Sequence, residues 1–249
     1  MSIIKHFNLP YLNPIPIFFL EDKMKKLSLF FIAMLFMLPF IGCKNEQPAK
    51  LLYQGHASFR LVAKNGTVVY IDPFAGEGYD LPADIILVTH QHSDHNKIDL
   101  IKQNKGCVVI SNEEALKDKK HNTFKIKGIK IESVEAKNFQ HHPSASVGYI
   151  ITVDGISLYH AGDTSKTDQM STLQDKNLNY AILPCDGVFN MNPEAAAECA
   201  RIIGAQHNIP IHTGPFSGSK PAKLLDRTIA ERFDAPNRLI LEPGEEIEI

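Results

Sequence analysis

The chain lacks tryptophan, has only four cysteines and contains no run of basic residues. It also shows no internal repeat and no low-complexity tract, and its formal net charge is -2. Nucleic-acid binders gather Lys and Arg on one face, so we expect no nucleic-acid partner. With 249 residues, 44% of them hydrophobic, the chain can form one large domain or two small ones around a packed core.

The cysteines argue against two further classes. Beyond Cys43, the chain has Cys107, Cys185 and Cys199, an odd number without a CxxC pair, so no disulfide framework is indicated. There is no GxSxG, and Cys185 has no histidine in a triad-like context. We therefore expect neither a serine nor a cysteine nucleophile.

The amino terminus reads as a targeting segment. Two lysines follow Met24, an alternative start, and precede the apolar run Leu27–Ile41, which ends at Gly42 and Cys43. This end resembles the lipobox of bacterial lipoproteins, with Phe40 where leucine is more usual. The resemblance implies a signal segment over 1–43, a lipid anchor on Cys43 and a place in the bacterial cell envelope. An ordinary transmembrane anchor or an unlipidated signal peptide is the alternative.

A polar tether, 44–50, leads into a domain over 51–249 whose two halves share one style. Each half begins with hairpin patterns and continues with strands that alternate with helices. The predicted hairpins turn at Asn65-Gly66, Lys127-Gly128 and Asp154-Gly155. Predicted strands cover IILV, CVVIS, YAILP, NIPIH and RLILEP, and predicted helices cover KIDLIKQN, NEEALKDK, PEAAAECARIIG and PAKLLDRTIAERF. Two packed sheets with helices outside are therefore expected.

The most unusual stretch is THQHSDH, which directly follows the apolar run IILV. Residues two apart on an extended segment point to the same face, so His90 and His92 can bind one cation. A turn after them would bring Asp94 and His95 to the other side, where a second cation can bind. Imidazole nitrogen and carboxylate oxygen suit zinc, with manganese or iron as alternatives. The spacing predicts a metal site rather than solvated histidines at a strand end.

THQHSDH resembles the HxHxDH signature of the metallo-β-lactamase superfamily. HASFRL, IDPF, YHAGDT and PIH stand around it in the family's order, so the resemblance extends from about Leu51 to the carboxyl terminus. Within this superfamily, the chain most resembles the branch of small metal-dependent hydrolases similar to L-ascorbate-6-phosphate lactonase. The resemblance implies an α+β protein, a four-layer αβ/βα sandwich with two divalent metal ions at one edge of its sheets.

The resemblance also implies a ligand set. The expected metal ligands are His90, His92, Asp94, His95, His142, Asp163 and His212. The third histidine of the first metal comes from HHPSASVGY, where His142 is preferred and His141 is the alternative. The glycine-rich stretch that commonly precedes this ligand is missing here. Asp163 would bridge both metals, although alone it reads equally well as a turn residue.

Other polar residues receive supporting roles. Asp72 is expected to accept a hydrogen bond from a ligand histidine or the loop. His56 and His160 are interpreted as structural or supporting residues, with His160 kept beside Asp94 as a candidate catalytic residue. TGPFSGSK, which contains Lys220, and LPCDGVFNMN would wall the substrate site, or are ordinary loops.

The expected chemistry follows from two cations that share a water. Such a pair gives hydroxide near neutral pH, which can attack an ester, a lactone or a phosphodiester. In true β-lactamases of the family, cysteine most often stands where Asp163 does, so little penicillin hydrolysis is expected. The predicted function is a metal-dependent hydrolase acting on a small, possibly anionic substrate. A non-catalytic metal- or ligand-binding lipoprotein of the same fold is the alternative.

Overall fold

The computed structural model describes residues 47–214 and 223–249. The predicted signal segment with Cys43, the tether as far as residue 46 and Lys220 lie outside the described residues. Within the described ranges, no helix has both the length and the apolar character that a membrane crossing requires.

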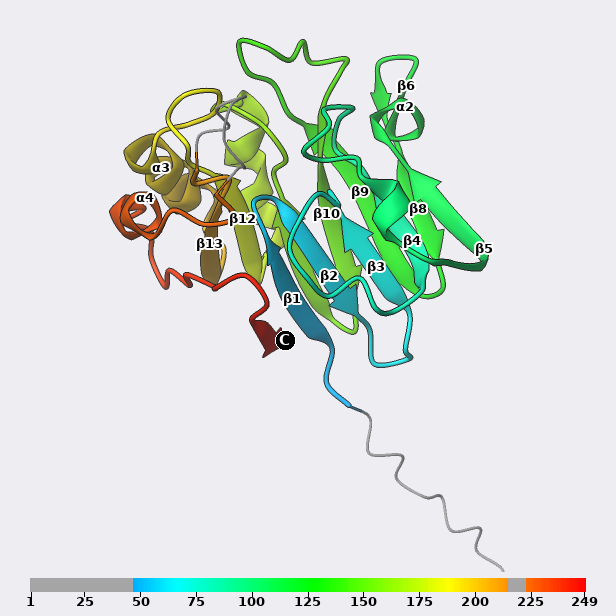
Figure 1. The fold of residues 1–249 in the computed structure, drawn as a ribbon. Coiled ribbons are helices and arrows are strands. Elements are labelled where there is room, and N and C mark those ends of the chain that lie inside the picture. The colour runs from blue at the N-terminus through cyan, green and yellow to red at the C-terminus, as the bar shows by residue number, and fades with distance from the viewer. Residues whose placement is uncertain (1–46, 215–222) are drawn as a thin grey trace, which may run out of the picture. The chain divides into compact units, whose positions relative to one another are not determined.

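Two six-stranded sheets form the body of the structure (Figure 1). The first sheet has the order β14-β1-β2-β3-β4-β5, and its strands are β1 (Lys50–Gly55), β2 (Ser58–Val62), β3 (Val68–Ile71), β4 (Ala83–Leu87), β5 (Gln103–Ile110) and β14 (Glu246–Glu248). The second sheet has the order β13-β12-β11-β10-β9-β8, and its strands are β8 (Thr123–Ile126), β9 (Ile129–Glu135), β10 (Val147–Val153), β11 (Ile156–His160), β12 (Tyr180–Pro184) and β13 (His207–Ile211). A small hairpin joins β6 (Leu116–Lys117) to β7 (Lys120–His121).

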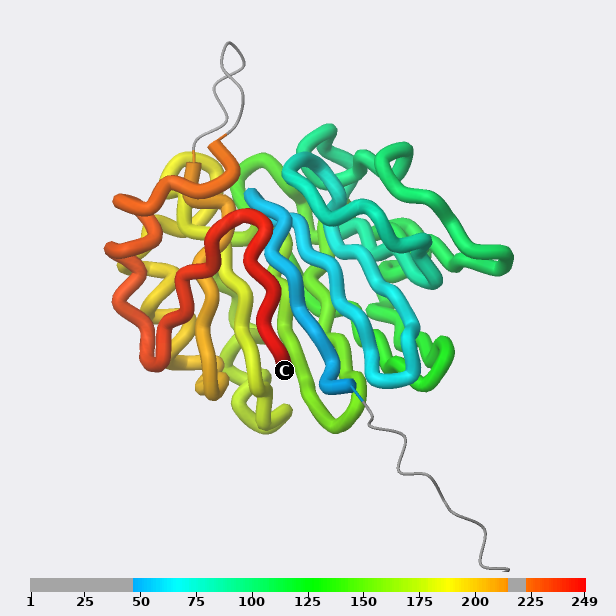
Figure 2. Tube along the Cα trace, turned by 60° about the horizontal axis from the view of Figure 1, so that its bottom comes forward, coloured from blue at the N-terminus to red at the C-terminus, as the bar shows by residue number. Residues whose placement is uncertain are grey.

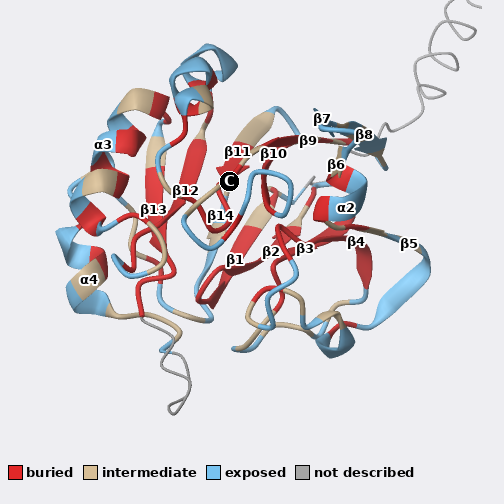
Figure 3. Ribbon diagram, turned by 90° about the horizontal axis from the view of Figure 1, so that it is seen from above, coloured by how far each residue is buried: buried red, intermediate tan, exposed pale blue. Residues whose placement is uncertain are grey.

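The main core lies between the two sheets. Side chains from alternate positions of each sheet, among them Tyr53, Phe59, Ile85, Tyr149 and Ile209, are fully buried in one cluster. Period-two alternation places every second side chain of a strand on one face, and burial of that face against the other sheet is the main source of stability. Figure 3 shows the buried strands of both sheets facing one another.

The outer layers differ between the two sheets. The second sheet packs against the helices η2 (Asp168–Lys176), α3 (Pro193–Ile203) and α4 (Arg227–Arg232). The first sheet packs against the loop with Tyr79 and Leu81 and the single 3₁₀ turn η1 (Ile98–Leu100). The predicted αβ/βα sandwich is confirmed, with one helical layer reduced to this loop and turn.

Most predicted elements are confirmed. The hairpin turns at Asn65-Gly66, Lys127-Gly128 and Asp154-Gly155 join antiparallel neighbours. Helix α3 begins with a proline and ends at Gly204, whose φ of 70° is left-handed. Ser111 caps α2 (Asn112–Ala115) in a capping box, although this helix lasts only one turn before β6 begins.

Three predicted elements differ from the structure. Within the described residues, PAKLLDRTIAERF is helical only as α4, because Asp226 caps a helix that begins at Arg227. KIDLIKQN forms only η1, because the strand β5 already begins at Gln103. RLILEP forms no strand beyond one isolated bridge at Arg238, and β14 closes the first sheet beside β1 instead. Figure 2 shows this last segment running next to β1.

Candidate metal centre

The strands that end at one edge of the two sheets determine where the polar side chains gather. In the first sheet β3 and β4 are parallel, and in the second sheet β11, β12 and β13 are parallel. The carboxyl ends of parallel strands meet at one edge, where backbone groups and loops are free to build a site. The sequence places Asp72, His90, His160, Asp186 and His212 at or just beyond these ends.

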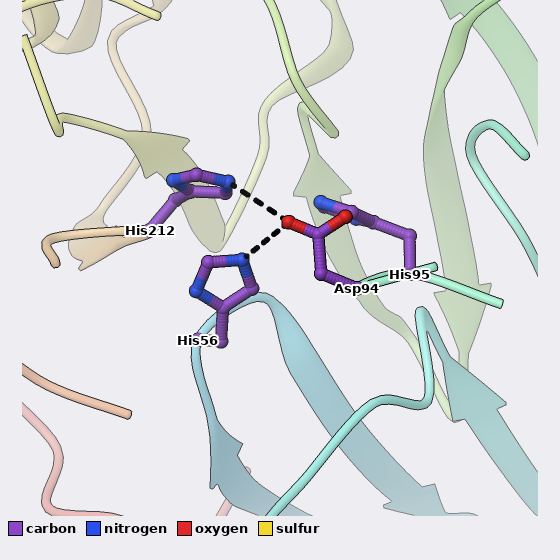
Figure 4. A group of neighbouring side chains, drawn as sticks. All are labelled: His56, Asp94, His95 and His212. Carbon is purple, nitrogen blue, oxygen red and sulfur yellow. Dashed lines mark hydrogen bonds and ion pairs between the residues drawn. The ribbon is translucent and has the colours of Figure 1, made fainter. Parts of the chain in front are cut away.

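Four residues form one compact group, shown in Figure 4: His56, Asp94, His95 and His212. Asp94 Oδ2 lies 3.3 Å from His56 Nε2 and 3.9 Å from His212 Nε2. The imidazoles of His56 and His212 are in contact, with ring centroids 3.9 Å apart. Asp94 is the one member that is not fully buried. A carboxylate therefore lies among three imidazoles at an accessible point.

A second group lies beside the first and consists of His90, His92 and His141. The Nε2 of His141 is 3.2 Å from His92 Nδ1, and the ring of His90 lies 4.4 Å from that of His141. Two of these histidines come from the end of β4, and the third comes from the loop between β9 and β10. The first and second sheets thus each contribute to this group.

Asp163 lies between the two groups. Its Oδ1 is 3.4 Å from His95 Nε2, and its Oδ2 is 3.5 Å from His212 Nε2. It also forms a potential ligand group with His90 and His95. The turn that carries Asp163 packs tightly, because a Cβ at Gly162 would lie 2.9 Å from Thr89 Cβ. One carboxylate therefore faces both histidine groups.

Hydrogen bonds behind the histidines determine which nitrogen faces the centre. Thr89 donates its N–H and its hydroxyl to the Asp72 carboxylate, each over 2.7 Å. His95 donates from Nδ1 to Asp72 over 2.8 Å, and the Thr89 oxygen lies 3.1 Å from His90 Nδ1. Since Nδ1 is engaged in both rings, Nε2 is the nitrogen that faces inward. The expectation that Asp72 accepts hydrogen bonds from a histidine and the loop is confirmed.

Asp186 orients His212 in the same way. Its Oδ2 lies 2.9 Å from His212 Nδ1. Its Oδ1 accepts the backbone N–H groups of Val188 and Phe189, over 2.6 and 2.7 Å. A carboxylate that is itself held by amides fixes the ring of the histidine it contacts. Asp186 was not among the predicted site residues, although an acid just after the buried strand β12 is the signal that marks it.

Backbone strain accompanies the geometry at three of these positions. His56, Asp72 and His212 have φ values of 58°, 45° and 48°, in the left-handed region that side chains seldom adopt. His56 forms the tight reversal between β1 and β2, and its N–H donates to Leu224. Strain of this kind, about 1–3 kcal/mol each, is characteristic of functional sites.

The electrostatics divide the histidines into two kinds. Burial lowers the pKa of His90 to about 3 and that of His56 to about 4, so both rings are neutral. Burial also opposes charge on His95, but Asp163 and Asp72 outweigh it and raise the pKa of His95 to about 9. Burial likewise opposes ionisation of Asp163, yet the surrounding histidines hold its pKa below the ordinary range.

The donor set fits divalent metal ions. His90 Nε2, His95 Nε2 and Asp163 Oδ1 are buried and have no hydrogen-bond partner among the described residues. Leaving buried polar atoms unpaired costs about 1–3 kcal/mol each, which a cation at their common point would offset. Imidazole nitrogens with a few carboxylate oxygens are the ligands that zinc and its neighbours prefer.

Two predicted site residues lie elsewhere. His142, preferred as the third histidine, is exposed, and its Nδ1 contacts Ser144 Oγ over 2.9 Å. The alternative, His141, is the one whose ring is buried against His90 and His92. His160 is fully buried, with Nε2 on Ala57 O and Nδ1 on Gly162 N, and it belongs to none of the ligand groups. These contacts agree with the structural interpretation of His160.

A hollow of about 570 Å³ opens beside the centre. It is lined by the loop 137–143, including His141, and by Ser165. A substrate in this hollow would therefore touch a residue of the histidine group directly.

Comparison with known proteins agrees with this geometry. The family described as "Beta-lactamase superfamily domain" matches residues 50–212. A protein of Methanoculleus marisnigri named UPF0173 metal-dependent hydrolase is 35% identical over 220 residues, covering 80% of this chain and 96% of the relative. A protein of the same name from Geobacillus thermodenitrificans is 30% identical over 232 residues, covering 80% and 100%.

Solved structures show the same fold. A putative metal-dependent hydrolase from Parabacteroides distasonis aligns with a TM-score of 0.63 at 27% identity, covering 77% of this chain and 92% of the other. The metallo hydrolase Igni18 from Ignicoccus hospitalis aligns with a TM-score of 0.63 at 22% identity, covering 82% and 99%, and shows likeness of fold.

Proposed function

The chain belongs to the metallo-β-lactamase superfamily and is a metal-dependent hydrolase, and on this premise we propose that two divalent cations act together in its centre. His90, His92 and His141 would hold the first cation, and Asp94, His95 and His212 the second. Asp163, which faces both groups, would contact each of them. The position of Asp163 between the two histidine groups is the observation that carries this proposal.

The proposed reaction is hydrolysis of an ester, a lactone or a phosphodiester. Two bound cations would lower the pKa of a shared water and stabilise the negative charge that develops on the substrate. The water oxygen bonds to the carbonyl carbon or phosphorus, the bond to the leaving oxygen breaks, and that oxygen departs as an alcohol.

Asp94 is the residue we propose to move the proton. Its side chain is partly exposed and its Oδ2 lies near the Nε2 atoms of His56 and His212, so the carboxylate can accept the proton of the water and return it to the leaving oxygen. Asp72 and Asp186 would hold the rings of His95 and His212 in place during this step. Zinc is the proposed metal, with manganese and iron as the alternatives.

The test compares metal content with activity. Purified protein should bind about two cations per chain and hydrolyse members of a panel of esters, lactones and phosphodiesters, and a chelator should abolish turnover until metal is restored. Asp94→Asn should reduce kcat by at least about a hundredfold, since a positioned acid-base group contributes roughly 10²–10⁴.

His207→Ala is the matched control for this series. His207 begins strand β13, whose other end leads into His212, and it stacks on Tyr180. This variant should keep its metal and its activity. Protein that binds a single cation at full activity, or that turns over equally well in chelator, would contradict the two-metal proposal.

For location, we propose a lipid anchor on Cys43 in a bacterial cell envelope. The lysines, the apolar run and the Gly42-Cys43 end of the segment 24–43 are the support for it. The mass of the mature protein tests this proposal, because an anchored chain would begin at Cys43 and carry acyl groups. A free cysteine at that position would end it.

A further inference from the structure

The two loops that meet beside the metal centre carry two of the four exposed large hydrophobic side chains in the described ranges. They are the β9–β10 loop (136–146) and the β12–α3 loop (185–192). Phe139 on the first loop and Val188 on the second are the two most exposed of these large apolar side chains, at 74% and 53%. Scattered apolar side chains are ordinary on a surface, but here the two most exposed lie on neighbouring loops at one site.

An aromatic pair joins the two loops. Phe139 stacks on Phe189 with ring centroids 6.3 Å apart and an angle of 22° between the planes. Phe139 also lines the hollow that reaches His141. The hollow therefore has an aromatic wall at one point and a proposed metal ligand at another.

We call Phe139 and Phe189 the aromatic wall. The two loops that carry it are connected by hydrogen bonds between polar side chains. Asn138 Nδ2 donates to Asn190 Oδ1 over 2.9 Å, which ties one loop to the other. Asn138 Oδ1 accepts the backbone N–H of His141 over 2.8 Å, while Asn190 Nδ2 donates to Asp186 over 2.8 Å. These bonds tie the loop that carries Phe139 to His141 and, through Asp186, to the residue beside His212 Nδ1. A preformed surface of this kind binds a ligand at low cost in conformational entropy.

The chemistry of the lining indicates what the wall binds. The ammonium group of Lys137, the lysine of this hollow, is paired with Glu135 over 2.8 Å. An aromatic face attracts planar or alkyl groups, and stacked aromatic pairs contribute about 0.5–1.5 kcal/mol beyond burial. The reacting group of the substrate can be polar, but a group beside it that enters the hollow meets the ring of Phe139.

We propose that Phe139, supported by Phe189, is a specificity-determining residue that binds an apolar, preferentially aromatic, group of the substrate next to its scissile bond. This deepens the proposed hydrolase function and rests on it. The substrate class is then an ester or phosphodiester with an aryl or alkyl substituent at the side that enters the hollow.

Kinetics on esters of similar reactivity test the proposal. For metal-loaded protein, kcat/KM is measured by a pH indicator with methyl acetate, methyl hexanoate and methyl 3-phenylpropanoate. The wild type should favour the phenyl ester over the acetate by about tenfold or more. In Phe139→Ala this ratio should fall to about twofold or less, and Phe139→Leu should restore the preference for the hexanoate but not for the phenyl ester.

Leu100→Ala is the matched control. Leu100 is also exposed, at 42%, but lies on η1 over the outer face of the first sheet. Its removal should leave the ratio of the three esters unchanged. A wild type without preference, or an unchanged ratio in Phe139→Ala while turnover still depends on metal, would overturn the proposal and leave the hydrolase function standing.

A binding measurement separates the two failures. If metal-loaded protein hydrolyses none of the esters, the proposed ester chemistry fails. Calorimetry with 2-phenylethylphosphonate and ethylphosphonate then tests whether Phe139 binds an aromatic group. The phenyl compound should bind about tenfold more tightly to the wild type than to Phe139→Ala, while the ethyl compound distinguishes them less. Equal affinity of both proteins for the phenyl compound would refute the proposal that Phe139 binds the aromatic group.

Discussion

At the scale of single residues, the centre depends on which nitrogen of each imidazole is free. Asp72, Thr89 and Asp186 contact Nδ1 atoms from behind, so Nε2 atoms of His90, His95 and His212 face inward. Such partners fix both the orientation and the tautomer of a ring, and their loss typically costs 10–100-fold in metal affinity. The supporting residues therefore matter as much for binding as the ligands themselves.

The neighbouring histidines of the β9–β10 loop provide one test at this scale. His141→Ala should lose about one cation per chain, because its ring is buried against His90 and His92. His142→Ala should keep both, because its ring is exposed and hydrogen-bonds with Ser144 rather than packing against His90 and His92. Metal analysis of the two purified variants measures the difference. Loss of a cation from His142→Ala alone would mean that His142, and not His141, is the third histidine ligand.

Asp186→Asn tests the support of His212. The amide keeps the shape of the side chain but removes the charge that holds His212 Nδ1, so affinity for the second cation should fall about 10–100-fold. Competition with a chromophoric chelator measures this affinity. Asp234→Asn is the control, because Asp234 is exposed and pairs with Arg201 at the surface. Equal affinities in both variants would mean that Asp186 only shapes its loop.

Proton release gives a test that needs no variant. The pKa of His95 is raised to about 9 by Asp163 and Asp72, despite burial, so the metal-free ring is protonated at pH 7. Its Nε2 can bind a cation only after losing that proton, so binding at pH 7 should release about one proton or more per chain. This number should decline as the pH passes 9, where the ring is already neutral. Calorimetry in buffers of different ionisation enthalpy measures it, and zero release at pH 7 would remove His95 from the ligands.

At the scale of elements, turns rather than strands carry the ligands. β11 runs directly into the turn with Gly162, at φ 62°, and this turn brings Asp163 to the end of β4. A side chain at Gly162 would meet both Thr89 and the carbonyl of Val147 at 2.9 Å. The contact between the two sheets at this point depends on the missing side chain.

Gly162→Ala should therefore lower both stability and metal content. Its left-handed backbone costs about 1–2 kcal/mol for a side chain, and the clash adds about 1–3 kcal/mol. Gly155→Ala is the matched control, because Gly155 has φ 86° but open space around a Cβ. It should show only the backbone cost and keep its metal. Chemical denaturation and metal analysis compare the two, and equal losses would mean that packing at Gly162 is unimportant.

Elements also show how far the sequence was informative. The spacing of His90, His92, Asp94 and His95 after an apolar run suffices to predict a metal site, because strand periodicity determines which side chains share a face. The position of His56 could not be predicted in this way. Nothing in LLYQGHASFRL marks a reversal except Gly55, whose φ of 112° is visible only in the fold. The choice between His141 and His142 likewise depends on how one loop packs.

At the scale of the whole molecule, the centre joins the two halves of the sandwich. The first sheet and its loops supply His90, His92, Asp94 and His95, while the second sheet supplies His141, Asp163 and His212. A cation bound by both halves stabilises the folded state, because it binds the unfolded chain much more weakly.

Removal of metal should accordingly lower the melting temperature. A metal at about a hundred times its dissociation constant contributes about 2.7 kcal/mol, which corresponds to roughly 5–10 °C for a domain of this size. Scanning fluorimetry with an extrinsic dye, before and after chelation, measures the shift. Re-addition of zinc should reverse it, whereas an unchanged melting temperature would mean that the cations contribute nothing to joining the halves.

The pairing of β14 with β1 has a practical consequence for handling the protein. β1 runs from Lys50 toward His56, so the domain begins at the end of the strand remote from the metal ligands, and Ile249 donates its N–H to Ala49 at that same end. A support, label or fused partner joined at the carboxyl end would lie away from the metal ligands and from the hollow beside them. Sensors or columns built by that attachment should leave substrate access unimpaired.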